Sequence, residues 1–203
     1  MTTIKDIISR WDSGDGKPYK GSLIDWSAYE ASPDSLGCMC AQGQVLHLLG
    51  GWKPERLRDV RQIEADAEVA SLLGISTGHS ILLRSINDSI DGAPSIVLTH
   101  PEKVLGDQAP TIVAMWRHMD RMTGEQWAAA GAAARDAVWV AARAAARAAA
   151  RDAAEAAASY AVAEIMGAKV LRERGHTFFF LPMFGFAEPE AIPALPASYG
   201  PAA

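Results

Sequence analysis

The stretch from Trp139 to Ala161, WVAARAAARAAARDAAEAAASYA, constrains the fold more than any other part of the chain. Alanine and arginine are among the strongest helix formers, so the stretch predicts a helix. Each alanine buries only about one methyl group, on the order of 0.8 kcal/mol, so the helix is a weak hydrophobic anchor. Its small side chains let a second helix approach near the lower end of the usual ~8–10 Å separation.

On a helical wheel the tract has an apolar seam and a charged side. The seam consists of Trp127, Gly131, Ala134, Val138, Ala142, Ala145, Ala149, Ala156 and Tyr160, and the charged side of Arg143, Arg147, Arg151, Asp152 and Glu155. Trp139 lies among the arginines, as an interface anchor would. Two uses fit: the seam packs on the chain's own first half, or it pairs with a second copy or another protein. The predicted interaction residues are Trp127, Val138, Trp139, Arg143, Arg147, Arg151 and Tyr160.

The predicted helix is too long for a compact chain. Thr123 and Gln126 form a capping-box pattern at its start. If one helix ran from there to Arg174 it would be roughly 75 Å long at about 1.5 Å per residue. A compact chain of this length is only about 40 to 45 Å across. We therefore expect the helix to break near Gly131 or Gly167, or to project and meet a partner.

The rest of the chain predicts short helices. Helical spacing of apolar residues, with caps and glycine stops, occurs at 3–11, 36–49, 54–74, 80–86 and 110–122. The fold class is therefore mainly α, with short N-terminal helices packed on the long alanine-rich helix. One small two-stranded β element is the alternative, pairing PSIVLTH (94–100) with HTFFFLP (176–182). We expect a helical region at 1–122, the long helix at 123–175 and a proline-rich end at 176–203, together forming one structural domain.

Composition narrows the class of protein. The chain has 203 residues, 49% of them hydrophobic and 21% charged, as in an ordinary globular protein. Its net charge of −5 argues against a large basic footprint, so nucleic acid is not an expected partner. Charges interrupt the one long apolar tract too often for a membrane span, and no secretory signal is recognisable. Two cysteines are too few for a disulfide framework, which indicates the cytoplasm.

The segment SLGCMCAQGQVLHLLGG offers one catalytic hypothesis. If Asp34 or Ser35 caps a helix whose first turn contains Cys38, the helix dipole and the free N–H groups stabilise a thiolate there. Cysteine hydrolases use this arrangement with a histidine base from a later segment. The candidates are Cys38 or Cys40 with His100 or His176. The alternative is that both cysteines are small buried residues.

The sequence gives less support to two other kinds of site, a metal site and a DNA-binding motif. Positions i and i+2 of a helix point apart, and the five histidines lack zinc-finger spacing, so we expect no metal. Residues 66–84 match the first helix and turn of a helix-turn-helix motif, but Ser80 stands where an apolar residue is expected. Basic side chains are absent from the exposed part of that second helix before Arg84. DNA binding through a degenerate motif is therefore an alternative only.

No dinucleotide-binding glycine motif, Walker loop or nucleophile elbow occurs, so we expect no cofactor. The Ala/Arg/Asp tract and LRERGHTFFFLPMFGFAEPEAIP resemble uncharacterised proteins of actinobacteria and their phages. This resemblance covers mainly the second half and implies neither an activity nor residue roles. The sequence as a whole favours a non-enzymatic cytoplasmic protein, of bacterial or phage origin, that binds a protein partner or itself as a homo-oligomer through the long helix.

Overall fold

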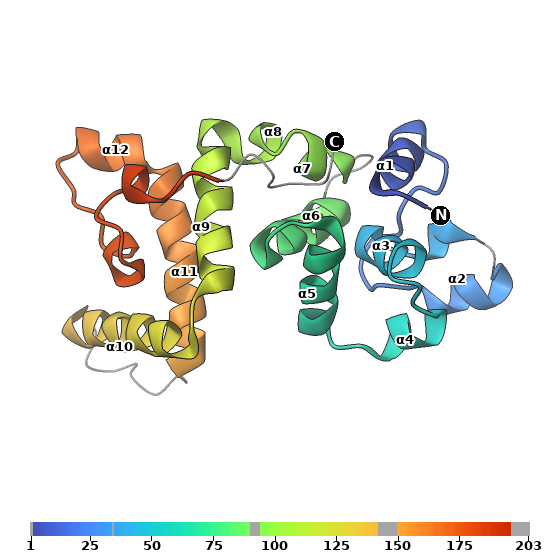
Figure 1. Ribbon diagram of the computed structural model, residues 1–203, viewed down its shortest axis with the longest axis horizontal. Helices are drawn as coiled ribbons and strands as arrows, with labels where there is room; N and C mark the ends of the chain where they lie inside the picture. The colour runs from blue at the N-terminus through green and yellow to red at the C-terminus, as the bar shows by residue number, and fades with distance from the viewer. Residues whose placement is uncertain (1, 34, 90–93, 142–149, 196–203) are drawn as a thin grey trace. The chain divides into compact units, whose positions relative to one another are not determined.

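The computed structural model describes residues 2–33, 35–89, 94–141 and 150–195, and their side chains except at 135–141 and 150–156 (Figure 1). The regular structure of this described part is helical, so the prediction of a mainly α protein is confirmed. Its only β feature is an isolated bridge between Ile24 and Met39. No single helix in this part is long and apolar enough to cross a membrane. The bent pair α5 (Gln62–Leu73) and α6 (Thr77–Ser89) together reaches the required length and apolar composition.

The chain divides into two compact units, unit 1 (Met1–Gly106) and unit 2 (Asp107–Leu195). The boundary precedes helix α9 (Ala109–Arg121), whereas the sequence-based division places a boundary after residue 122 and expects one domain. α9 buries Ile112, Val113 and Met115 and packs on a later helix of the alanine-rich part. An apolar helix face does not itself reveal which helix covers it, so the sequence could not assign α9 to its unit.

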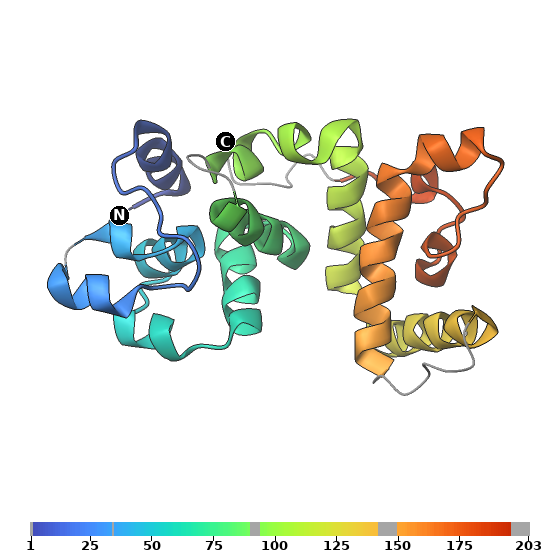
Figure 2. The same cartoon turned by 180° about the vertical axis from the view of Figure 1, so that it is seen from behind.

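In its described residues, unit 1 contains eight α-helices and one short 3-10 helix: α1 (Ile4–Ser13), α2 (Trp26–Ala31), η1 (Leu36–Cys38), α3 (Ala41–Leu48), α4 (Pro54–Asp59), α5, α6, α7 (Ser95–Thr99) and α8 (Glu102–Leu105). α1 forms as predicted, because Thr3 and Asp6 make a reciprocal capping box. α3 is packed against α4, α5 and α6 (Figures 1 and 2). The core of the unit therefore forms around a helix of only eight residues.

Three successive residues fasten α3 to its surroundings. Gln44 accepts a hydrogen bond from the Trp11 indole (2.9 Å) and donates to the Gly16 and Leu36 carbonyls (2.9 Å each). Gly43 lies so close to the chain before α2 that an added Cβ would stand 2.1 Å from the Leu23 oxygen. Gln42 is fully buried and reaches in the opposite direction, into the α5–α6 pair.

Gln42 belongs to a buried polar network between α3, α5 and α6. Its side-chain amide donates to Asp66 (2.8 Å) and to Ser80 (3.0 Å). Arg84 of α6 forms an ion pair with Asp66 (3.2 Å), which is only 4% exposed. A buried carboxylate is tolerated only when charge and hydrogen bonds compensate it, so the network ties three helices in one arrangement.

Unit 2 contains α9, α10 (Gly124–Ala141), α11 (Ala150–Met166), α12 (Ala168–Glu173), η3 (Leu181–Phe184) and η4 (Pro189–Ala191), and η2 (Gly106–Gln108) leads into it. Figures 1 and 2 show α9 and α11 side by side, with α10 crossing near one end of α11. α10 and α11 are packed against each other. In its described residues, the alanine-rich tract therefore forms two helices, and not the single projecting helix that was one of the two expectations.

The positions of the helix ends differ in part from expectation. Gly131 lies inside α10, while Gly167 separates α11 from α12. Residues 142–149, which join α10 to α11, lie outside the described residues. Small side chains explain why α10 and α11 pack so readily: Ala130, Ala134, Ala157 and Ala161 are all buried.

The β alternative is not confirmed. Ser95–Thr99 form helix α7, which buries Val97 and Leu98, and residues 177–180 are irregular up to η3. A run of only three or four apolar residues fits a short buried helix as well as a strand, so its length could not decide between them.

Candidate functional site

Large exposed apolar side chains gather on unit 2. Among the side chains that the structure describes, six large hydrophobic residues are exposed, and four of them belong to α11, α12 and the segment after α12. These four are Tyr160 (56% exposed), Met166 (57%), Val170 (48%) and Phe179 (52%). A protein surface that keeps several such residues together usually uses them for contact.

An open groove runs between α11, α12 and the phenylalanine segment. We call it the α11–α12 groove, and it is lined by Tyr160, Ala163, Glu164, Gly167, Val170, Leu171 and Phe180. The Tyr160 and Phe180 rings stack with centroids 4.8 Å apart, and Phe179 meets Phe180 edge to face at 5.1 Å. The groove thus has an aromatic wall, an aliphatic wall and a floor of small residues.

The sequence of α11 places these residues on one face. Ala157, Ala161 and Ile165 are buried at helical spacing and fix α11 in the unit. Ala163 and Gly167 follow Tyr160 by three and seven residues. These three residues therefore lie on one face of α11, different from the buried face, and line the groove. Gly167 ends the helix, so α12 starts in a new direction and supplies Val170 as the facing wall.

Glu164 holds the aromatic wall in place. Its two carboxylate oxygens accept hydrogen bonds from three consecutive backbone N–H groups, those of Phe179 (2.6 Å), Phe180 (2.9 Å) and Leu181 (2.9 Å). Leu181 is buried, and Phe184 is buried against Trp127 with ring centroids 6.3 Å apart. The phenylalanine segment is therefore anchored at the backbone of the residue that projects, Phe179, and by the residues that follow it.

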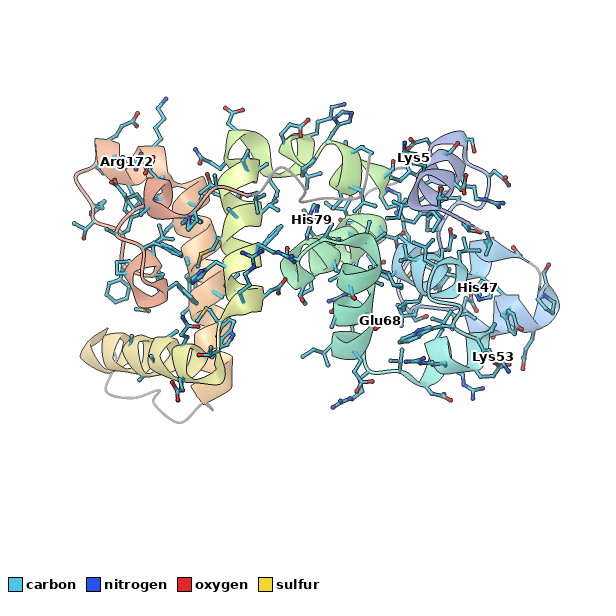
Figure 3. The ribbon with its side chains drawn as sticks, viewed as in Figure 1. Lys5, His47, Lys53, Glu68, His79 and Arg172 are labelled. Carbon is cyan, nitrogen blue, oxygen red and sulfur yellow. The ribbon has the colours of Figure 1, made fainter. Side chains whose placement is uncertain are left out.

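The charged groups near the groove form pairs. Lys169 and Glu173 lie 3.9 Å apart on the exposed side of α12. Arg172, labelled in Figure 3, pairs with Glu188 and Glu190 and lowers the pKa of the Glu190 carboxyl by donating a hydrogen bond to it. Because the groove's own carboxylate is occupied by backbone N–H groups, its lining offers contact area and no paired acid and base.

The predicted interaction residues are placed unevenly. Tyr160 lies in the groove and is exposed, whereas Trp127 is half-buried against Phe184 and serves packing inside the unit. Arg143 and Arg147 lie outside the described residues, and so do the side chains of Val138, Trp139 and Arg151. The sequence reasoning missed Phe179, Val170 and Gly167. For Phe179, the signal in the sequence was the run of three phenylalanines at 178–180, because a short segment cannot bury all three rings.

The cysteine site is not assembled as the hydrolase hypothesis requires. Cys38 ends η1 and donates to the Ser35 carbonyl (2.9 Å), while the helix proper begins at Ala41. Cys40 is the N-cap of that helix, and its burial raises the pKa of its thiol to about 11. Ser35 caps η1 as expected, since its Oγ accepts a hydrogen bond from the Gly37 N–H, but this helix ends at Cys38, and α3 begins separately at Ala41 with Cys40 as its N-cap.

The two proposed histidine bases have other surroundings. His100 is exposed and lies 3.3 Å from Glu102. His176 is exposed and belongs to unit 2, whereas both cysteines belong to unit 1. Among the residues that the structure describes, no group of three or more histidine, cysteine, aspartate or glutamate side chains could hold a metal ion. Neither cysteine hydrolysis nor zinc binding therefore gains support.

The helix-turn-helix geometry is present but lacks basic groups. α5 and α6 are bent by 107° at a short turn that starts with Gly74 in the left-handed conformation. Such an angle is typical of the motif. However, Ser80 is buried against Gln42, and Arg84 pairs with Asp66 instead of facing outward. The exposed residues of α6 are Ile81, Ser85, Asp88 and Ser89, which offer no cation to phosphate.

The buried histidine of α6 completes the interior of unit 1. His79 donates from Nε2 to the Val97 carbonyl (2.7 Å), and burial lowers its pKa. Figure 3 labels it on α6 and His47 on α3; His47 bonds through Nδ1 to the Trp52 carbonyl (2.8 Å). Both rings serve contacts between elements of the same unit.

The chain matches no protein-family model, no curated protein and no solved structure. The resemblance of its second half to actinobacterial and phage proteins therefore stays a prediction. Relatives contribute no activity, substrate or partner to the assignment of function.

Proposed function

We propose that the protein is a non-enzymatic binding protein whose contact surface is the α11–α12 groove with the adjoining ring of Phe179. The observation that carries this proposal is the exposure of the large apolar side chains of Tyr160, Val170 and Phe179 in and beside this groove. Taking about 200 Å² for a whole aromatic side chain, Tyr160 and Phe179 each leave about 100 Å² exposed. Val170 brings the apolar area to roughly 270 Å², close to the few hundred Å² that surface patches of monomeric proteins rarely exceed.

Rigid presentation supports contact as the purpose of this surface. A flexible phenylalanine would lose side-chain and backbone entropy on binding, at a cost to affinity. Here the backbone of Phe179 and Phe180 is fixed by the Glu164 carboxylate, and the Phe180 ring is stacked on Tyr160. The groove is therefore organised before any partner arrives.

The chemistry of the other candidate sites favours binding over catalysis. The Cys40 thiol has a pKa of about 11, so it is protonated at neutral pH and is a poor nucleophile. The exposed part of α6 has no basic side chain, which disfavours DNA. Both cysteines are buried and free, which supports the proposed cytoplasmic location because reduced thiols persist there.

Site-specific photo-crosslinking in cells tests the proposal. A photoreactive phenylalanine analogue replaces Phe179, and the matched control carries it at Ala128, an exposed position of α10 in the same unit. We expect a discrete crosslinked protein adduct from position 179 and none from position 128. The absence of any discrete adduct from position 179, in a variant that keeps its helical circular dichroism, would refute a protein-binding role.

A further inference from the structure

We draw no further inference here: the strongest candidate, the open apolar groove between α11, α12 and the phenylalanine segment of unit 2, belongs to the contact surface already proposed, and nothing in the structure shows what covers it.

Discussion

Removal of the Glu164 carboxylate should loosen the aromatic wall of the groove. Glu164→Ala leaves the N–H groups of Phe179, Phe180 and Leu181 without their acceptor. A hydrogen bond to a charged acceptor contributes about 1.5–3 kcal/mol, but water can reach the N–H of exposed Phe179 and replace much of that bond. The two part-buried N–H groups then dominate, and we expect unit 2 to lose about 2–3 kcal/mol of stability.

Hydrogen exchange followed by mass spectrometry measures this effect directly. The amides of residues 179–181 should exchange faster in Glu164→Ala, while those of unit 1 should keep their rates. Glu164→Gln should be intermediate, because it retains one acceptor oxygen. Urea unfolding, followed by near-ultraviolet circular dichroism, gives the accompanying change in the free energy of unfolding.

Glu173→Ala is the matched control for this prediction. Glu173 is an exposed glutamate of the same unit, and its ion pair with Lys169 spans 3.9 Å at the surface. Such a pair contributes at most about 1 kcal/mol, so the exchange of residues 179–181 should not change. Equal exchange rates in Glu164→Ala and the wild-type chain would refute the anchoring role of Glu164.

Three further predictions concern unit 1. Gly43→Ala should destabilise the unit by about 3 kcal/mol or more in urea unfolding, because the new Cβ meets the Leu23 oxygen at 2.1 Å; Gly124→Ala, with open space around it, should change little. Burial lowers the pKa of His79, so its contribution to stability is complete above the ordinary value of 6.5 and is lost as the pH falls below it. His79→Gln, which keeps a donor for Val97, should flatten this pH dependence; an unchanged slope would contradict it. Iodoacetamide should fail to label Cys40 in the folded chain at neutral pH and should label it in urea, whereas labelling without denaturant would show an accessible thiolate.

Local signals made part of the fold predictable from the sequence. Thr3 with Asp6 marks the start of α1, and Gly74 marks the end of α5, because a cap depends on residues that are neighbours in the chain. α1 formed where the spacing of apolar residues predicts it, whereas the helix predicted over 54–74 is divided into α4 and α5 at Val60 and Arg61. The packing of α10 against α11 could not be predicted in this way, since the alanines of the tract give no local signal that divides it into two helices.

Of the residues that line the groove, only Tyr160 was predicted from the sequence as an interaction residue. Tyr160 stood out on the helical wheel, but the exposure of Phe179 depends on a glutamate fifteen residues earlier that fixes its backbone. The start of α3 was not predictable from the sequence either. Ser35 caps the short helix η1, as the sequence predicts, but the new helix start at Cys40 goes with the packing of Gly43 on Leu23, which the local sequence does not reveal.

The attachment of α3 has a consequence for how relatives of this chain should be sought. Gln42, Gly43 and Gln44 each meet a different requirement of unit 1, so a substitution at any one of them has to be accommodated by a separate part of the fold. The alanine-rich tract, by contrast, can exchange residues freely as long as it stays helical and small. Distant relatives should therefore be recognisable by the short segment CAQGQ at residues 40–44, even when their alanine-rich tracts no longer align with this one.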